Sequence, residues 1–129
     1  MPNYETNMYN FLKRKGLADK YEKSGIYCIK TDDDIVYIGK SHNMLKRVAQ
    51  HYVGIQKQSE LKYRILAEAR RKGHTINFDV LYYATESGYN AVKDEIGTKE
   101  GEYIREYKPA LNTQIPKETD YHKFNVCRV

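Results

Sequence analysis

Apolar positions along this chain of 129 residues recur with two different spacings. Spacings of three and four predict helices over residues 5–15, from about 43 to 53, from about 60 to 72, and from about 88 to 107. β-Branched and aromatic residues predict strands on both sides of residues 32–34, and a third strand over residues 76–84. The predicted order is therefore α-ββ-α-α-β-α, followed by a short tail.

Capping residues and helix breakers set the expected ends of these elements. Ser41 or Asn43 can cap the second helix, and Ser59 can cap the third. We expect Gly54 to end the second helix and the last helix to stop before Pro109. The third strand should present one apolar face, made by Ile76, Phe78, Val80 and Tyr82.

The stretch SGIYCIKTDDDIVYIGK, residues 24–40, is predicted to be a β-hairpin that turns at the three aspartates. The register with the cleanest apolar face pairs Tyr27 with Tyr37, Ile26 with Ile38, and Cys28 with Val36. Both tyrosines then lie on the opposite face. Cross-strand aromatic pairs are usually structural, so the hairpin alone does not indicate chemistry.

Two polar residues on the second helix are spaced four apart, which places Arg47 and His51 next to each other on one face. They lie at the flank of the apolar stripe made by Met44, Leu45, Val48 and Tyr52, where the edge of the core would be. A solvated helix face would explain the same spacing.

The last helix carries a carboxylate on its apolar side. A helical wheel places Val92, Ile96, Tyr103, Ile104 and Tyr107 in one sector of about 120°. Glu100 falls inside this sector, whereas Glu95, Glu102 and Glu106 fall on the solvent side. A carboxylate that faces a core must be paired, protonated or bound to a metal ion. An ion pair with Arg47 is the structural alternative, and Asn112 could either orient the carboxylate or serve only as a turn residue.

Composition narrows the class of protein. The length suits one domain, no apolar run approaches the ~20 residues of a membrane span, and the first residues lack a signal peptide, so we expect a soluble, cytoplasmic protein. Cys28 and Cys127 show no zinc-binding spacing and are expected to be reduced thiols. The net charge is +5, and basic residues cluster at 40–47 and 62–74, which suits a polyanionic partner.

Six elements in order resemble the GIY-YIG nuclease family: GIY at 25–27, YIG at 37–39, KSHNMLKR ending at Arg47, His51, EGEYI starting at Glu100, and KPALN ending at Asn112. This family includes the nuclease domain of the bacterial excision-repair incision protein and several phage homing endonucleases. The resemblance covers residues 24–113 and leaves 1–23 as an N-terminal helical extension and 114–129 as a tail. It implies an α+β fold, a small antiparallel three-stranded sheet flanked by helices. The family spacing selects Glu100 over Glu102, as the helical wheel does.

The resemblance also implies roles for these residues. Tyr27 would be the general base for water, Arg47 would clamp the scissile phosphate, and Glu100 would hold one Mg²⁺ or Mn²⁺ ion; Tyr37, His51 and Asn112 would complete the site. A phenol of pKa ~10 needs nearby positive charge to act as a base, so His51 remains an alternative base. The expected contacts with DNA are Lys40, Lys46, Arg47, Arg70 and Arg71.

The expected function is that of a metal-dependent DNA endonuclease, and the alternative is a non-catalytic nucleic-acid-binding domain that retains the fold. The expected partner is DNA and not a membrane. Because only residues 1–23 and the tail lie outside the family domain, we expect either weak specificity or specificity supplied by a homodimer or a partner protein.

Overall fold

The computed structural model of the protein describes residues 3–112, so the expected tail 114–129 lies outside the described residues. The elements are α1 (Tyr4–Arg14), α2 (Ala18–Tyr21), β1 (Gly25–Thr31), β2 (Asp34–Ser41), α3 (Met44–Lys57), α4 (Leu61–Arg71), β3 (Ile76–Tyr83) and α5 (Tyr89–Tyr107). The predicted order of elements is confirmed, and α2 is a short addition that the apolar pattern did not predict. Among residues 3–112, no helix has the length and apolar character needed to cross a membrane.

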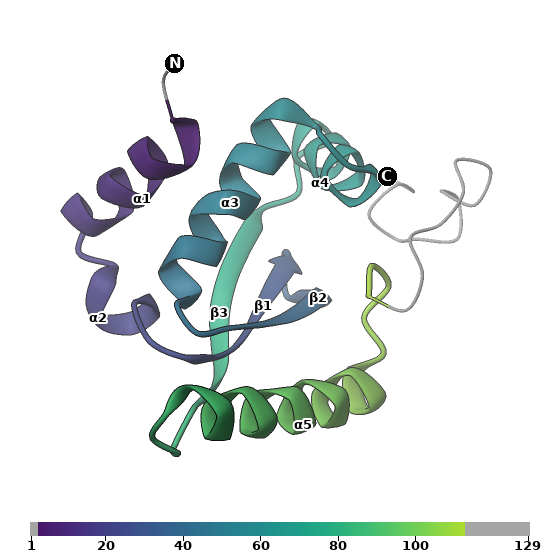
Figure 1. The fold of residues 1–129 in the computed structure, drawn as a ribbon. Coiled ribbons are helices and arrows are strands. Elements are labelled where there is room, and N and C mark those ends of the chain that lie inside the picture. The colour runs from purple at the N-terminus through teal and green to yellow at the C-terminus, as the bar shows by residue number, and fades with distance from the viewer. Residues whose placement is uncertain (1–2, 113–129) are drawn as a thin grey trace.

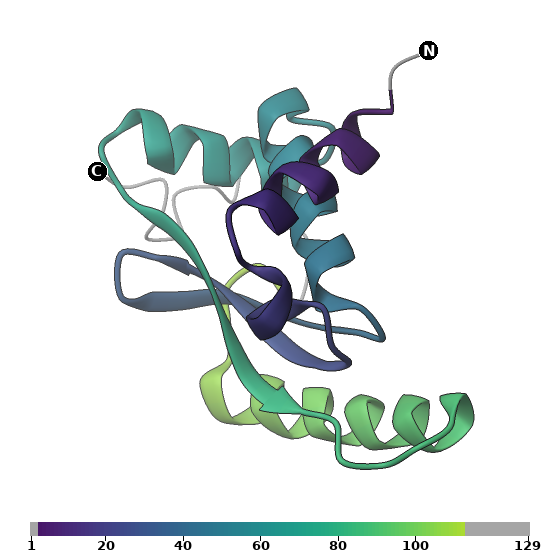
Figure 2. The same cartoon turned by 90° about the vertical axis from the view of Figure 1, so that its left-hand side faces the viewer.

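The three strands form one antiparallel sheet in the order β2-β1-β3, so β1 is central and β2 is an edge strand. Helices α3 and α4 cover one face of the sheet and α5 covers the other, while α1 lies against the outer side of α3 (Figures 1 and 2). The predicted α+β fold, a small antiparallel sheet flanked by helices, is confirmed. Leu12 of α1 and Tyr21 of α2 share a buried cluster with Met44 and Leu45 of α3, so the N-terminal helices are part of the core.

The register of the hairpin differs from the expected one by two residues. Tyr27 lies opposite Gly39, and Tyr37 lies opposite Ile29. The chain makes a tight turn at Asp32 and Asp33, and a β-bulge then interrupts the pairing between Ile29 and Lys30. The turn and the bulge each shift the pairing by one position. Because two shifts restore the side-chain parity, both tyrosines still lie on one face of the sheet.

A second bulge alters the expected alternation of β3. The pairing with β1 shifts between Ile26 and Tyr27, which leaves Leu81 without a directly paired residue. Phe78 and Val80 therefore pack on the α3 side, but Tyr82 packs with Ile26 on the α5 side. The expectation that Tyr82 shares a face with Phe78 and Val80 is wrong for this reason.

Two expected helix ends are also wrong. Helix α3 continues through Gly54 to Lys57 and ends at Gln58, whose φ of 53° lies in the left-handed region. The N-cap of α4 is Glu60 and not Ser59. Of the two candidate caps for α3, Asn43 is the N-cap, and its side chain accepts a hydrogen bond from the backbone nitrogen of Lys46 at 3.2 Å.

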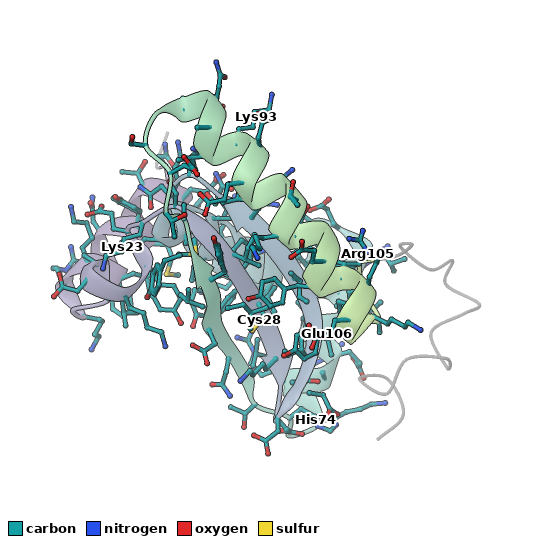
Figure 3. All side chains as sticks on the ribbon, turned by 90° about the horizontal axis from the view of Figure 1, so that it is seen from below. Lys23, Cys28, His74, Lys93, Arg105 and Glu106 are labelled. Carbon is teal, nitrogen blue, oxygen red and sulfur yellow. The ribbon has the colours of Figure 1, made fainter. Side chains whose placement is uncertain are left out.

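Helix α5 buries Val92 and Ile96 against the sheet, beside Cys28 and Ile38, whereas Tyr107 is 47% exposed. Figure 3 views the molecule from this side and shows Lys93 and Arg105 projecting away from the sheet.

Candidate active site

Three aromatic side chains from three elements meet on the face of the sheet that α3 covers. The ring centroids lie 6.4 Å apart for Tyr27 and Tyr37, 5.4 Å for Tyr27 and His51, and 5.5 Å for Tyr37 and His51. The sequence placed His51 at the edge of the core, but its side chain is fully buried. The structure thus brings together three of the residues that the sequence singled out.

A chain of hydrogen bonds crosses this cluster. The Tyr27 hydroxyl lies 2.7 Å from Nε2 of His51, and Nδ1 of His51 lies 2.8 Å from the hydroxyl of Tyr63 on α4. These two contacts satisfy both ring nitrogens, which is why a histidine can be fully buried at this position. Tyr63 was not among the residues that the sequence predicted for the site.

The three hydrogen-bonded residues, Tyr27, His51 and Tyr63, are held in their neutral forms. Burial, together with the charges of Arg47 and Lys62, lowers the pKa of His51 to about 2. Burial raises the pKa of Tyr63 to about 12, and burial also raises the pKa of Tyr27 well above its ordinary value, with Arg47 acting in the opposite direction. Near neutral pH, a neutral imidazole therefore donates to one tyrosine and accepts from the other.

Two cations border the cluster. Arg47 is half-buried on α3, and its Nη1 donates to Oε1 of Gln50 at 2.7 Å. The Lys62 ammonium lies 4.9 Å from the ring centroid of Tyr37 and 3.9 Å from a carboxylate oxygen of the exposed Glu60. Burial lowers the pKa of Lys62, and the like charge of Arg47 contributes. Two cations held together in this way make the site attractive to a phosphate anion.

The sequence contains a signal for Lys62 that the prediction did not use. Lys62 stands three, four and seven residues before Ile65, Leu66 and Ala69, so it lies in the apolar stripe of its helix. All three of these apolar residues are buried, and Lys62 is only 8% exposed. A lysine in the apolar stripe of a helix therefore indicates a functional site as well as a glutamate does.

The glycine of the YIG motif makes room for Tyr27. A Cβ atom at Gly39 would lie 2.3 Å from the Tyr27 hydroxyl oxygen and 2.5 Å from its Cζ. Since Gly39 faces Tyr27 across the two strands, the phenol ring lies directly over it. The first motif glycine, Gly25, is equally constrained, because a Cβ there would lie 2.1 Å from the carbonyl oxygen of Tyr82.

Glu100 lies across strand β2 from this cluster. Its carboxylate is 3.8 Å from the ammonium of Lys40, and its side chain is 24% exposed. The ion-pair partner of Glu100 is thus Lys40 and not Arg47, the partner that the sequence suggested. Burial raises the pKa of Glu100, and the charge of Glu100 in turn contributes to the raised pKa of Tyr37. The charge of Glu100 thus reaches the tyrosine of the YIG motif.

Asn112 binds the exposed edge of β2. Its Oδ1 accepts from the backbone nitrogen of Ile38 at 2.6 Å, and its Nδ2 donates to the Ile38 carbonyl oxygen at 2.7 Å. The backbone nitrogen of Leu111 donates to the carbonyl oxygen of Val36 at 2.9 Å. The suggestion that Asn112 orients a carboxylate is not supported, because its amide holds the backbone of Ile38.

The expected DNA contacts are dispersed. Lys46 is exposed and lines a cavity of about 460 Å³ with Tyr9 and Asn43, between α1 and α3. Arg70 and Arg71 are exposed on the last turn of α4, where Arg71 binds the carboxylate of Glu68. The first turn of α4 carries Lys62 to the site. Arg70 follows Lys62 by eight residues, which is about 12 Å along the helix.

The residues present suit a metal ion that needs few protein ligands. Within residues 3–112, no three His, Cys, Asp or Glu side chains are grouped so that they could enclose a metal ion. Glu100 offers one partly buried carboxylate, which pairs with the exposed Lys40 at 3.8 Å. Mg²⁺ commonly binds one or two carboxylates and completes its octahedron with water and substrate phosphate.

In its motifs and in the order of its elements, the chain resembles the GIY-YIG nuclease family. No family model matches the chain. Endonuclease II of Enterobacteria phage T4 is 26% identical over 119 residues, a similarity that spans 83% of each chain.

Solved structures of the GIY-YIG N-terminal endonuclease domain of UvrC from Thermotoga maritima are also similar. One of them, bound to magnesium, has a TM-score of 0.47 and 20% identity. A point mutant bound to the catalytic divalent cation has a TM-score of 0.47 and 22% identity. Both comparisons cover 78% of this chain and 94% of the other.

Proposed function

We propose that this protein is a metal-dependent DNA endonuclease that hydrolyses phosphodiester bonds. The observation that carries the proposal is the contact of 2.7 Å between the Tyr27 hydroxyl and His51, beside Arg47 and across β2 from Glu100. Its similarity to a phage endonuclease supports this function. A domain that only bound nucleic acid would not need a base, a cation and a carboxylate around one edge of its sheet.

Tyr27 and His51 act in series as the general base. The raised pKa of Tyr27 rules out a free phenolate near neutral pH. As water attacks phosphorus, its proton passes to the Tyr27 oxygen while the Tyr27 proton passes to Nε2 of His51. Neither residue then needs to ionise before the substrate arrives, so the two candidate bases are parts of one pathway.

Arg47 and Lys62 hold the scissile phosphate. Arg47 offers a planar, permanently charged fork to two phosphate oxygens, and Lys62 offers a point charge from the other helix. Both charges stabilise the additional negative charge that develops on the non-bridging oxygens in the transition state.

Glu100 would hold one Mg²⁺ or Mn²⁺ ion on the leaving-group side, where such an ion stabilises the departing oxygen. Lys40 neutralises this carboxylate in the free protein. If the carboxylate bound a metal ion instead, the Lys40 ammonium would be available to bind a DNA phosphate.

The proposed catalytic domain is residues 24–113, with 1–23 as an N-terminal extension, whose helix α1 packs on α3. The partner is DNA, and a homodimer or a partner protein would supply specificity. The location that goes with this proposal is the cytoplasm.

The test compares Glu100→Ala with Glu102→Ala, a glutamate two residues away that is exposed. We expect Glu100→Ala to abolish cleavage of plasmid DNA in Mg²⁺ while DNA binding and the thermal midpoint of unfolding are retained. Glu102→Ala should cleave nearly as fast as the wild type. A wild-type protein that binds DNA but does not cleave it in Mg²⁺ or Mn²⁺ would favour the non-catalytic alternative.

A further inference from the structure

The hydroxyl of Tyr63 reaches the far side of the His51 ring from Tyr27. Tyr63 is 3% exposed, and its hydroxyl lies 2.8 Å from Nδ1 of His51. It comes from α4, which contributes none of the six motif elements described above. The structure therefore adds a helix to the catalytic cluster.

A glycine in the neighbouring helix leaves the space that this ring occupies. A Cβ atom at Gly54 of α3 would lie 2.3 Å from Cε2 and 2.5 Å from Cζ of Tyr63. The sequence suggested that Gly54 ends α3, but α3 continues through it to Lys57. Gly54 has a packing role, because it lets the Tyr63 ring lie close enough to α3 to reach His51.

The hydrogen-bond partner of Nδ1 determines whether Nε2 can accept a proton. A neutral imidazole carries one proton, on either Nδ1 or Nε2. If Nδ1 carries it and donates to the Tyr63 oxygen, Nε2 has a free lone pair that can accept the proton of Tyr27. If Nε2 carries it, His51 donates to Tyr27 and cannot accept that proton.

We propose that Tyr63 is a positioning residue that holds His51 as the Nδ1–H tautomer, so that Nε2 faces Tyr27 as a proton acceptor. The inference rests on the proposed function for its catalytic consequence. Tyr63 does not act on substrate, and its effect passes through His51. Such outer partners commonly fix the tautomer and orientation of a functional histidine.

The groups that face His51 favour a neutral ring, which carries a single proton to be placed. Arg47 of α3 and Lys62 of α4 are the charged residues that act on it, and both oppose a second proton. Tyr27 and Tyr37 face it from the sheet, and Phe78 of β3 covers it at a centroid distance of 6.1 Å.

The experiment reads the tautomer directly by two-bond ¹⁵N–¹H correlation spectra of ¹⁵N-histidine-labelled protein at pH 7, without metal or DNA. His51 is assigned by elimination from variants that replace the other histidines. We expect the Nδ1–H form in the wild type. In Tyr63→Phe, which keeps the ring in the Gly54 slot but removes the acceptor, we expect the proton to move to Nε2.

Cleavage kinetics on the same variants give the second measurement. We expect Tyr63→Phe to lower kcat by at least about tenfold and at most by the 10²–10⁴-fold that a general base contributes, with KM unchanged. Tyr21→Phe is the matched control, because it also removes a buried hydroxyl, one that donates to the Phe78 carbonyl oxygen at 2.8 Å. It should leave both the tautomer and kcat unchanged.

Several results overturn the proposal: an Nε2–H form of His51 in the wild type, an unchanged tautomer in a folded Tyr63→Phe, or a shifted tautomer with wild-type kcat. The wild-type spectrum decides even if Tyr63→Phe does not fold. A wild-type protein without cleavage activity would refute the proposed function, while the spectra would still test the assignment of the tautomer.

Discussion

Replacing Gly39 by alanine tests whether the position of Tyr27 matters for catalysis. The new Cβ would lie 2.3 Å from the Tyr27 hydroxyl oxygen, whereas ordinary contacts start at 3.4 Å. The phenol must therefore move by about 1 Å. The backbone at Gly39 accepts alanine, since its φ is not positive. The substitution thus perturbs Tyr27 and little else.

The size of the effect follows from what Tyr27 loses. If the ring stays, the overpacked strand costs about 1–3 kcal/mol. If the ring rotates away, the hydrogen bond of 2.7 Å to His51 is lost and a buried polar group stays unpaired, which also costs about 1–3 kcal/mol. These are alternatives and not a sum, so we expect a loss of about 1–3 kcal/mol in the free energy of unfolding. A displacement of about 1 Å at a reacting group can lower the rate about 10²-fold.

The assay combines denaturant unfolding with the rate of plasmid cleavage at saturating DNA. Gly97→Ala is the matched control, because its Cβ would meet the Lys40 ammonium at an ordinary 3.6 Å and alanine is the better helix former. We expect Gly97→Ala to be as stable as the wild type or more so, and to remain active. A Gly39→Ala variant with wild-type stability and kcat would show that Tyr27 does not occupy the proposed place.

Three further variants test other parts of the site and its support. Lys62→Met should weaken DNA binding and reduce the slope of log K against log salt by about 0.9, because one phosphate contact is lost. An NMR titration should also show a raised pKa of His51, because the charge of Lys62 lowers it. Asn112→Ala should lower the free energy of unfolding by about 1–3 kcal/mol, measured by denaturant unfolding, because two hydrogen bonds to Ile38 disappear. Hydrogen bonds from Tyr82 and the following loop lower the pKa of Glu95 to about 2. The stability that this gives is complete above the ordinary pKa of 4.5 and is lost as the pH falls towards 2, so thermal midpoints measured from pH 2 to 7 should fall less steeply for Glu95→Gln.

The order of elements could be predicted because local patterns determine it. Apolar spacing and turn residues identified every helix of more than four residues and every strand among residues 3–112. The shared face of Tyr27 and Tyr37 was also predictable, since it depends only on parity along the strands. Their exact partners were not, because a bulge is set by packing between strands and leaves little trace in one sequence.

The outer glutamate of α5 shows a second limit of sequence patterns. The helical wheel placed Glu95 towards solvent, yet its carboxylate accepts hydrogen bonds from the Tyr82 hydroxyl and from the backbone nitrogens of Thr85 and Glu86. A wheel compares a residue only with its own helix. The loop that approaches Glu95 comes from β3, so its effect could not be found from the α5 sequence alone.

The residues that share the site by long-range packing were the hardest to predict. Glu100 was found by its position in an apolar sector, but its partner Lys40 lies sixty residues earlier in the chain. Tyr63 stands in no motif or spacing that marks it as part of the site. Its contact with Gly54 gives that glycine a packing role within α3, which ends at Gln58. A glycine within a helix can therefore indicate a neighbouring aromatic ring as well as a helix end.

The weak basicity of His51 in the free protein fits a base that substrate activates. Burial is the largest cause of its lowered pKa, and the charges of Arg47 and Lys62 are the other two. A phosphodiester anion bound between these cations would cancel much of their field at the imidazole, and the pKa of His51 would rise towards the range in which it accepts a proton. The cations that hold the phosphate would thus also set the strength of the base. In this scheme, Tyr27 would lose its proton only when a phosphate is in place, so the free enzyme would keep both groups neutral near neutral pH.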